Sequence, residues 1–426
     1  MLTAPLPQAF SLANGVRLRV TPNPGANIIA ARLFVGVGTW KEAPSQQGIS
    51  NLLAAVLTKG TPSRSALAIG ELVEGLGAGF GTDATPDYFV VSLKAVGHDF
   101  VPLLTLAADV LRNPTFPPEE IELERRMVLQ MIQAQGEQPF LVAIEQLRRA
   151  LYPSHVYGVG SLGKAETVAT LEQSDLQAFH RAHFYPKNLV ISVAGAVDAP
   201  RVQEWVEQCF GDWQGEAPPE TPPPVLPPPQ DDRWLCCPHS SQQTLILLGY
   251  PVPGISHSAY VALKLLSTYL GGGMSSRLFV QLREQQGLAY DVSAFYPTRR
   301  WGSSLVAYVG TAPEKGAIAL EQLHQELQCL SQNPLDEPTV QALRHKVLGQ
   351  YLLGQQTNDQ LAHLAGWYEI LGLGRDFDAQ FQAQVKGIQS LDLWSVARTY
   401  LQHPWVSLVG PESGLTALEP LRSQIL

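Results

Sequence analysis

Two side chains in the second half of the chain could stabilise negative charge that develops on a substrate oxygen. Arg283 and Tyr290 stand seven positions apart. A guanidinium is always charged and presents a rigid fork of donors, and a phenol O–H donates a directed hydrogen bond where charge develops. A structural alternative stays open, in which Arg283 pairs with Glu284 or another acid and Tyr290 wedges between a helix and a strand.

A run of three glycines, Gly271 to Gly273, lies upstream of this pair. Exposed amides of such a run can hold phosphate, but the run lacks the G-K-[ST] ending and the preceding strand of a P-loop. Glycine is also the usual residue just past a helix end, and an apolar helical pattern ends at Leu270. We expect the run to end that helix, and a role in substrate binding stays open beside this one.

Residues that bind metals are present, but not in the spacing of a known site. Cys236 and Cys237 are adjacent, whereas tetrahedral zinc sites use spacings such as C-x₂₋₄-C. His180 and His183 lie near an expected helix end, with no acid in motif spacing. Both pairs are expected to be surface or packing residues, so the chain is predicted to hold no metal or other cofactor of its own.

The composition excludes several functional classes. A net charge of −9 argues against nucleic-acid binding, which selects basic faces. No apolar run is long enough to cross a bilayer, so no membrane contact is expected. The stretch Met1 to Ser11 lacks a basic region followed by an apolar one, and we therefore expect a cytoplasmic protein.

A proline-rich stretch divides the chain into two halves that resemble each other. Residues 217–230 read APPETPPPVLPPPQ, and proline at this density prevents a helix or a central strand, so a stiff extended linker is expected. The flanking domains are then 1–216 and 231–426. Residues 116–128 and 335–347 both begin a helix with proline and acids, as helix N-termini prefer, which indicates a domain duplication.

Each half is predicted to be mixed α and β. The first half shows apolar strand patterns and amphipathic helix patterns, with strands at 16–20, 28–37, 88–94 and 189–194 and helices at 46–58, 66–76, 100–111 and 118–135. The second half repeats this order, with strands at 244–248, 289–295 and 303–309 and helices at 256–270, 275–285, 314–330 and 336–353. We predict an α+β fold of two related half-domains, each with a mostly antiparallel sheet covered by helices.

The segment from Gly48 to Thr61 resembles the pitrilysin and mitochondrial-processing-peptidase family, whose zinc peptidases carry the inverted H-x-x-E-H motif. The family segment reads approximately G-x-x-H-x-x-E-H-x-x-F-K-G-T, and Gly48 and the Lys-Gly-Thr at 59–61 fit it. Further similar segments follow in the same order along the whole chain, at 118–125, 183–195, 271–279 and 282–290.

The residues that depart from the family pattern are those that would hold zinc. Asn51, Ala54 and Ala55 stand at the first histidine, the glutamate and the second histidine of the motif. The third ligand of the family is a glutamate in a V-L-x-E-I context, where this chain has Met131. Alanine has no donor atom, and a thioether suits this type of site poorly. Gly81 replaces an asparagine that binds the substrate strand in catalytic members.

The resemblance also implies a role for the polar pair. In heterodimeric members, an Arg/Tyr pair like Arg283 and Tyr290 lies across a cavity from the partner's zinc and binds the substrate carbonyl. A glycine-rich segment, here Gly271-Gly272-Gly273, lies near the cavity in the non-catalytic subunit. The retained Arg277 and Lys59 are expected to have structural roles. Each chain would then form half of a clam-shell dimer.

The sequence therefore predicts a non-catalytic, substrate-binding subunit of a heterodimeric zinc metallopeptidase, whose partner chain carries H-x-x-E-H and the zinc. Such a chain would be inactive alone and would bind peptide substrates. A non-proteolytic scaffold, or a homodimer that holds peptides, is the alternative of a different class. An enzyme with unrelated chemistry ranks last, because the chain has no nucleophile-elbow motif and no dinucleotide-binding fingerprint.

Overall fold

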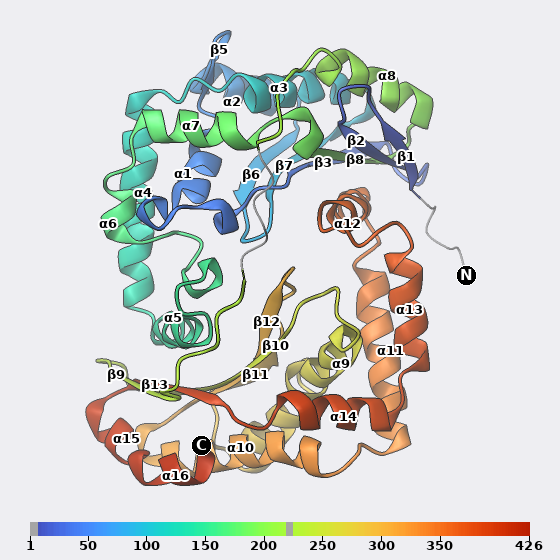
Figure 1. Cartoon of the computed structure of the whole chain (residues 1–426). Coiled ribbons are helices and arrows are strands. Elements are labelled where there is room, and N and C mark those ends of the chain that lie inside the picture. The colour runs from blue at the N-terminus through green and yellow to red at the C-terminus, as the bar shows by residue number, and fades with distance from the viewer. Residues whose placement is uncertain (1–6, 219–224) are drawn as a thin grey trace. The chain divides into compact units, whose positions relative to one another are not determined.

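Two large β-sheets organise the computed structural model, which describes residues 7–218 and 225–426 (Figure 1). The described residues fall into two compact units with one large sheet each. The chain segments of unit 1 are 7–132, 160–218 and 352–377, and those of unit 2 are 133–159, 225–351 and 378–426. The halves of the sequence and the compact units are thus different divisions of the chain.

The sheet of unit 1 has six strands in the spatial order β1-β2-β8-β3-β7-β6. Its strands are β1 (Gln8–Ser11), β2 (Arg17–Pro22), β3 (Ile28–Val35), β6 (Gly79–Ala84), β7 (Phe89–Val96) and β8 (Leu189–Gly195). β2 and β8 run parallel, and all other neighbours in this sheet are antiparallel. A separate hairpin joins β4 (Gly60–Thr61) to β5 (Arg64–Ser65). β6 occupies one edge of the large sheet.

The sheet of unit 2 has five strands in the order β11-β12-β10-β13-β9. Its strands are β9 (Trp234–Pro238), β10 (Thr244–Pro253), β11 (Asp291–Phe295), β12 (Gly302–Thr311) and β13 (Trp405–Gly410). β13 and β9 run parallel, and the remaining neighbours are antiparallel. Apart from β1, the two sheets therefore have the same strand order and place their one parallel pair at the same position. This topology confirms the predicted α+β fold and its duplicated layout.

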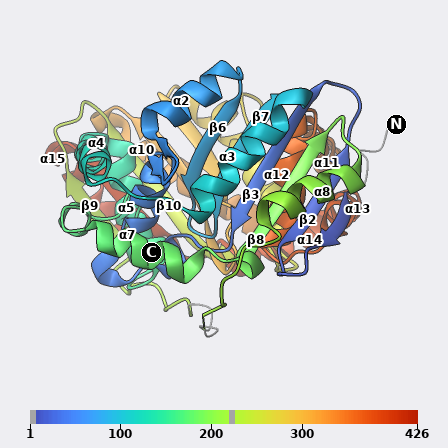
Figure 2. The ribbon, with the colours of Figure 1, turned by 90° about the horizontal axis from the view of Figure 1, so that it is seen from above.

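Helices cover the sheet of unit 1 and bury its apolar face. They are α1 (Ile49–Val56), α2 (Ala66–Gly75), α3 (Phe100–Arg112), α4 (Pro118–Gly136), α6 (Ala165–Val168), α7 (Gln173–His183) and α8 (Ala199–Phe210). Figure 2 shows α3 and α8 lying over this sheet, where α3 packs on β7 and α8 on β2. α1 packs against β6, and this contact sets the position of the family segment.

The helices of unit 2 follow the same plan. They are α9 (Tyr260–Gly271), α10 (Gly316–Gln332), α11 (Glu337–Leu353), α13 (Phe377–Gly387), α14 (Ser390–Tyr400), α15 (Glu412–Thr416) and α16 (Arg422–Ile425). α9 packs on β11, and α10 packs on β12. Residues 279–285, predicted as part of an ordinary helix, form a π-helix, a rare geometry that is frequent at functional sites.

Two further helices cross between the sequence halves. α5 (Pro139–Leu151) precedes the proline-rich stretch but packs on β13 and β10 of unit 2. α12 (Asn358–Ile370) follows that stretch but packs on β3 and β8 of unit 1. Since β13 and β10 correspond to β8 and β3, the two helices are exchanged between equivalent positions.

Glycines permit the close approach of both exchanged helices. A Cβ atom on Gly249 of β10 would lie 2.7 Å from the Cδ2 atom of Leu147 on α5, and a Cβ on Gly366 of α12 would overlap the ring of Phe34 on β3. Leu147 and Phe34 are fully buried. A side chain of α5 is therefore seated on sheet backbone, and the backbone of α12 is seated on a sheet side chain.

The predicted linker is described only in part. Residues 219–224 lie outside the described residues. Residues 225–230 contain no helix or strand, as the proline content predicts. The backbone of Gln230 bonds to α5 and β13: its N–H donates to Ala150 O at 2.9 Å, and its carbonyl accepts from the Trp405 indole at 2.8 Å.

Candidate functional site

α1 carries the three motif positions on a short helix with a firmly held start. Ala54 is buried, and Asn51 and Ala55 are half-buried. The N-cap is Gly48, whose φ of 100° lies in the left-handed region, where glycine has no steric penalty. The Thr82 hydroxyl on β6 donates to the carbonyl of Ala54 at 2.7 Å. The backbone that would present a metal site is thus fixed against the edge strand.

A buried acid, which the sequence reasoning did not single out, holds the start of α1. The Glu42 carboxylate accepts the backbone N–H groups of Gly48 and Ser50, each at 2.9 Å. Burial raises the pKa of Glu42 to about 7, although these two amides act in the opposite direction. An acid a few residues before a helix N-terminus is the signal that could have revealed it.

The residues at the metal positions do not fit zinc. Ala54 and Ala55 offer no ligand atom, and the thioether of Met131 on α4 is 46% exposed and too soft for a site of this type. No group of three or more His, Cys, Asp or Glu side chains in the described parts of the chain could hold a metal ion. No step of a reaction can be routed through a metal on these residues.

Arg283 is exposed on the π-helix of unit 2. Its guanidinium carbon lies 5.0 Å from the centroid of the Phe279 ring, one turn earlier. Within residues 7–218 and 225–426, Arg283 forms no ion pair with Glu284 or any other acid. Arg283 is therefore not the acid-paired arginine of the structural alternative, and its N–H donors are available to a ligand.

Tyr290 is also exposed, at 59%, and directly precedes β11. Its backbone N–H donates to Gly310 O at 2.9 Å, which fixes the main chain while the phenol stays at the surface. The π-helix packs against β11. The two side chains therefore belong to contacting elements of one unit, and Tyr290 is not the buried wedge of the structural alternative.

The three glycines of the run 271–273 have different structural roles. Gly271 is the last residue of α9, and a Cβ there would overlap the backbone of Ala294 on β11. Gly272 is the C-cap, whose N–H donates to Thr268 O at 2.9 Å. Gly273 has a φ of 97° and open space around its Cα. The predicted helix end is confirmed, and at Gly273 the chain is unobstructed.

The retained family positions Arg277 and Lys59 form ion pairs. Arg277 holds Glu326 of α10 through two contacts, at 2.6 and 3.1 Å. Lys59 lies 2.7 Å from Glu124 and 4.0 Å from Glu120 of α4. Both contacts connect elements within one unit, as expected for structural residues.

The histidine and cysteine pairs are packing and surface residues. His180 hydrogen-bonds to Leu111 O at 2.8 Å through Nε2 and stacks on Phe184. Burial lowers the pKa of both His180 and His183 to about 4, so both rings are neutral near pH 7. Cys236 and Cys237 are neighbours on β9, where consecutive side chains point to opposite faces.

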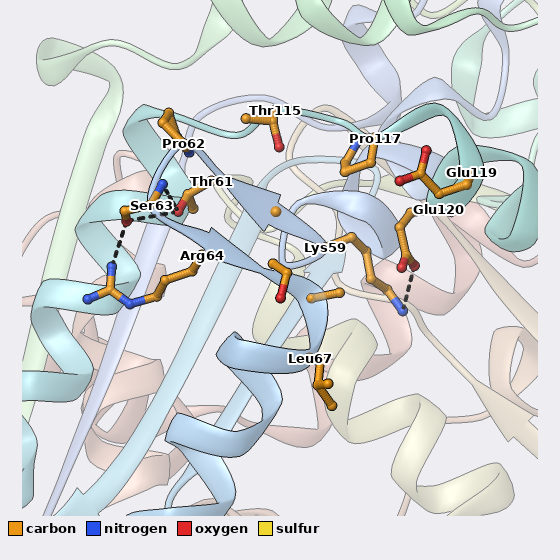
Figure 3. Close-up of a pocket in the computed structure, with 13 residues that line it drawn as sticks. Lys59, Thr61, Pro62, Ser63, Arg64, Leu67, Thr115, Pro117, Glu119 and Glu120 are labelled. Atoms are coloured by element: carbon orange, nitrogen blue, oxygen red, sulfur yellow. Dashed lines mark hydrogen bonds and ion pairs between the residues drawn. The ribbon is translucent and has the colours of Figure 1, made fainter.

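A pocket of about 560 Å³ lies beside the end of α1 (Figure 3). The β4–β5 hairpin and the start of α4 line it. Figure 3 shows Lys59 turned toward Glu120, while Arg64 reaches away from them; the Arg64 guanidinium pairs with Asp109 at 3.0 Å. None of the metal positions lines this pocket, and its cations Lys59 and Arg64 are held in ion pairs within unit 1.

Comparison with known proteins gives matches over most of the chain. Residues 19–162 match the model of the insulinase family, peptidase family M16, and residues 170–347 match that of the M16 peptidase inactive domain. An uncharacterized zinc protease of Mycobacterium tuberculosis is 26% identical over 98% of this chain and 97% of its own length. One of Bacillus subtilis is 26% identical over 85% of this chain and 88% of its own.

Solved structures share the fold. A protease from Helicobacter pylori superposes with a TM-score of 0.89 at 20% identity, covering 95% of this chain and 99% of that one. An M16 inactive-domain structure from Pseudomonas fluorescens gives a TM-score of 0.87 at 22% identity, covering 95% and 98%. No helix among the described residues is long and apolar enough to span a membrane.

Proposed function

The chain belongs to the insulinase (M16) family of peptidases, and from this premise we propose that it is the non-catalytic, substrate-binding subunit of a heterodimeric zinc metallopeptidase. The observation that carries the proposal is the state of α1. Its N-cap and its contact with β6 are formed, and Lys59, three residues past its end, forms an ion pair. Its side chains at the motif positions are Asn51, Ala54 and Ala55. A partner chain with H-x-x-E-H would supply the zinc.

The exposed pair in unit 2 is the contribution of this chain to the partner's site. The Arg283 guanidinium is free of acids among the described residues, so its N–H groups can donate to a peptide carbonyl without first breaking an ion pair. The Tyr290 hydroxyl adds a second donor. Donors that are in place before charge develops on the carbonyl oxygen favour the transition state over the substrate. Of the three glycines, Gly273 has open space beside it and would let a peptide backbone approach closely, while Gly271 and Gly272 hold the end of α9 in place.

The test is a peptidase assay on an unstructured peptide. It compares this chain alone, an H-x-x-E-H family member from the same organism alone, and the two mixed. Activity in the mixture only, reduced roughly 10²-fold by Arg283→Ala and by Tyr290→Phe, is the expected result for lost oxyanion donors. Tyr290→Phe removes only the hydroxyl and keeps the ring.

A matched control is Arg201→Ala in unit 1. Arg201 is also exposed and lies over an aromatic ring of its own helix, at 5.2 Å from Trp205, so its removal should leave the mixture active. Zinc-dependent activity of this chain alone would refute the proposal. If neither the Arg283 nor the Tyr290 variant lowers the activity of the mixture, the result would favour a scaffold role. If this chain binds peptide as a dimer of two copies, the result would favour the peptide-binding homodimer.

A further inference from the structure

Four polar side chains in unit 2 have buried atoms without a hydrogen-bond partner. Arg148 and Tyr152 lie at the C-terminal end of α5, His155 lies in the following turn, and Arg299 lies in the loop before β12. The atoms concerned are Arg148 Nε, Tyr152 Oη, His155 Nε2 and Arg299 Nη1. Buried polar groups in folded proteins nearly always have a partner, so four exceptions that lie close together in the fold need a cause.

The four side chains belong to one cluster. The ring centroids of Tyr152 and His155 are 6.3 Å apart, and both rings contact Tyr157. The Arg299 guanidinium lies over that same Tyr157 ring, at 4.5 Å from its centroid. Burial has the largest effect on the pKa of each of Arg148, Tyr152 and His155, and the charge of Arg299 has the second largest.

All four orphaned atoms can donate a hydrogen bond. Arginine nitrogens only donate. His155 Nδ1 accepts the backbone N–H of Tyr157 at 3.1 Å, so the neutral ring carries its proton on Nε2. The Tyr152 hydroxyl has Ser304 as a neighbour but no hydrogen bond of acceptable geometry. A ligand with several acceptor positions would satisfy these donors, and an anion offers such positions without adding a donor.

The positive charge of the cluster has no directly paired counter-ion, although the charge of Glu145 acts on the pKa of Arg148 in the raising direction, after burial and Arg299. Neither Arg148 nor Arg299 forms an ion pair with a carboxylate in the ranges that the structure describes. The acid on the preceding turn of α5, Glu145, is bound by Arg149 at 2.5 Å. Burial, and then the charge of Arg299, lowers the pKa of Arg148. A buried charge without a counter-ion is costly, and a bound anion would remove that cost.

We propose that Arg148, Tyr152, His155 and Arg299 form an internal anion site that binds a small inorganic anion. The orphaned atoms are closed to solvent, which favours a compact ion, a halide or a small oxyanion, over an organic phosphate. The anion would join the end of α5 to the loop before β12. The site lies wholly in unit 2 and does not depend on the peptidase proposal.

Urea unfolding of the full chain tests the site, because urea adds no ions. Sodium chloride, sodium phosphate and sodium gluconate are compared at matched ionic strength, with gluconate as the bulky organic anion. We expect the urea midpoint to rise saturably with chloride or phosphate, as for a ligand that binds only the folded state, and to stay unchanged in gluconate. Which inorganic salt acts distinguishes a halide from an oxyanion. Equal midpoints in all three salts would overturn the proposal.

Two variants separate the site from general salt effects. Arg148→Met should abolish the difference between chloride or phosphate and gluconate, whereas Arg149→Met, one residue later and exposed, should keep it. A response retained in full by Arg148→Met would also overturn the proposal. If that variant fails to fold, the His155 ring resonance of the wild type is followed by NMR. Its pKa should rise when the effective anion replaces gluconate, and a titration insensitive to the anion would contradict the site.

Discussion

At the scale of single residues, backbone contacts hold the segment that resembles the family motif, and its motif positions carry Asn51, Ala54 and Ala55. Glu42, Gly48 and Thr82 hold both the start and the body of α1. These contacts involve backbone atoms of α1, so they do not depend on which side chains stand at the motif positions. Replacing the side chains should therefore leave the helix in place.

This independence predicts that a zinc site can be restored. A variant with Asn51→His, Ala55→His and Met131→Glu is expected to retain about one zinc ion per chain after dialysis, since two histidines four residues apart face the same side of a helix. Elemental analysis of wild type and variant measures this. Asn51→Ala, Ala55→Ser and Met131→Leu together form the control, and zinc retained equally by the control would refute the prediction.

Glu42 predicts a pH-dependent stability. Its pKa in the folded chain, about 7, exceeds the ordinary value of 4.5, so between these values the folded state binds more protons than the unfolded state. Stability contributed by this group therefore falls as the pH rises from 4.5 to 7. As the pH rises through that window, the free energy of unfolding of Glu42→Gln should increase relative to that of the wild type, by up to about 3 kcal/mol. Urea unfolding at pH 5 and pH 8 measures the gain, and parallel behaviour of the two proteins would rule it out.

His180 predicts the opposite sign. Its folded pKa of about 4 lies below the ordinary 6.5, so the unfolded state binds more protons in between, and stability is lost as the pH falls from 6.5 to 4. His180→Gln keeps a donor for the Leu111 carbonyl but does not titrate. The variant should lose less stability on acidification, by up to about 3 kcal/mol. The exposed His98→Gln is the control, and should follow the wild type.

At the scale of helices and strands, local patterns predicted about half of the elements, but neither of the exchanged helices α5 and α12. The apolar periods at 100–111 and 118–135 and the proline and acids at 118–120 fixed α3 and α4 to within one or two residues. α5 has an apolar face, but the sequence analysis did not predict this helix, and nothing local indicates that its face packs on the sheet of the other half. The π-helix also escaped prediction, because its residues suit an ordinary helix.

The candidate site was predictable to a similar degree. The types and spacing of Arg283 and Tyr290 indicated donors, while their exposure and the missing acid partner required the structure. Glu42 and the four orphaned donors of unit 2 could not be found from spacing, because long-range packing alone determines which polar atoms are buried without partners.

The glycine run gives a prediction for the contact of α9 with β11. Gly271→Ala should destabilise the chain by roughly 3 kcal/mol or more, because the added Cβ would overlap backbone that cannot move aside. The Cβ added by Gly273→Ala would contact no neighbouring atom, and only the positive φ would be unfavourable, so this variant should lose about 1 to 2 kcal/mol of stability. Thermal unfolding of both variants measures the contrast, and equal losses would show that Gly271 is not constrained as described.

At the scale of the whole molecule, the exchanged helices make each half of the sequence incomplete. Without α12, β3 and β8 lose the helix that packs on them, and without α5, β10 and β13 lose theirs. Fragments 1–216 and 231–426 should therefore be insoluble or unfolded when expressed singly and should form a stable one-to-one complex when expressed together. Size-exclusion chromatography measures this, and two separately folded, non-associating fragments would contradict the exchange.

The same exchange bears on how a duplicated chain of this kind could arise. A half of this topology buries its sheet only by receiving a helix from another half, so as a separate polypeptide it would be complete only as a reciprocal pair. Joining two copies replaces a concentration-dependent encounter by an intramolecular one, in which the linker sets the effective concentration. Once joined, the two copies no longer need to remain identical. One copy can then lose its reactive side chains while the other keeps a binding surface.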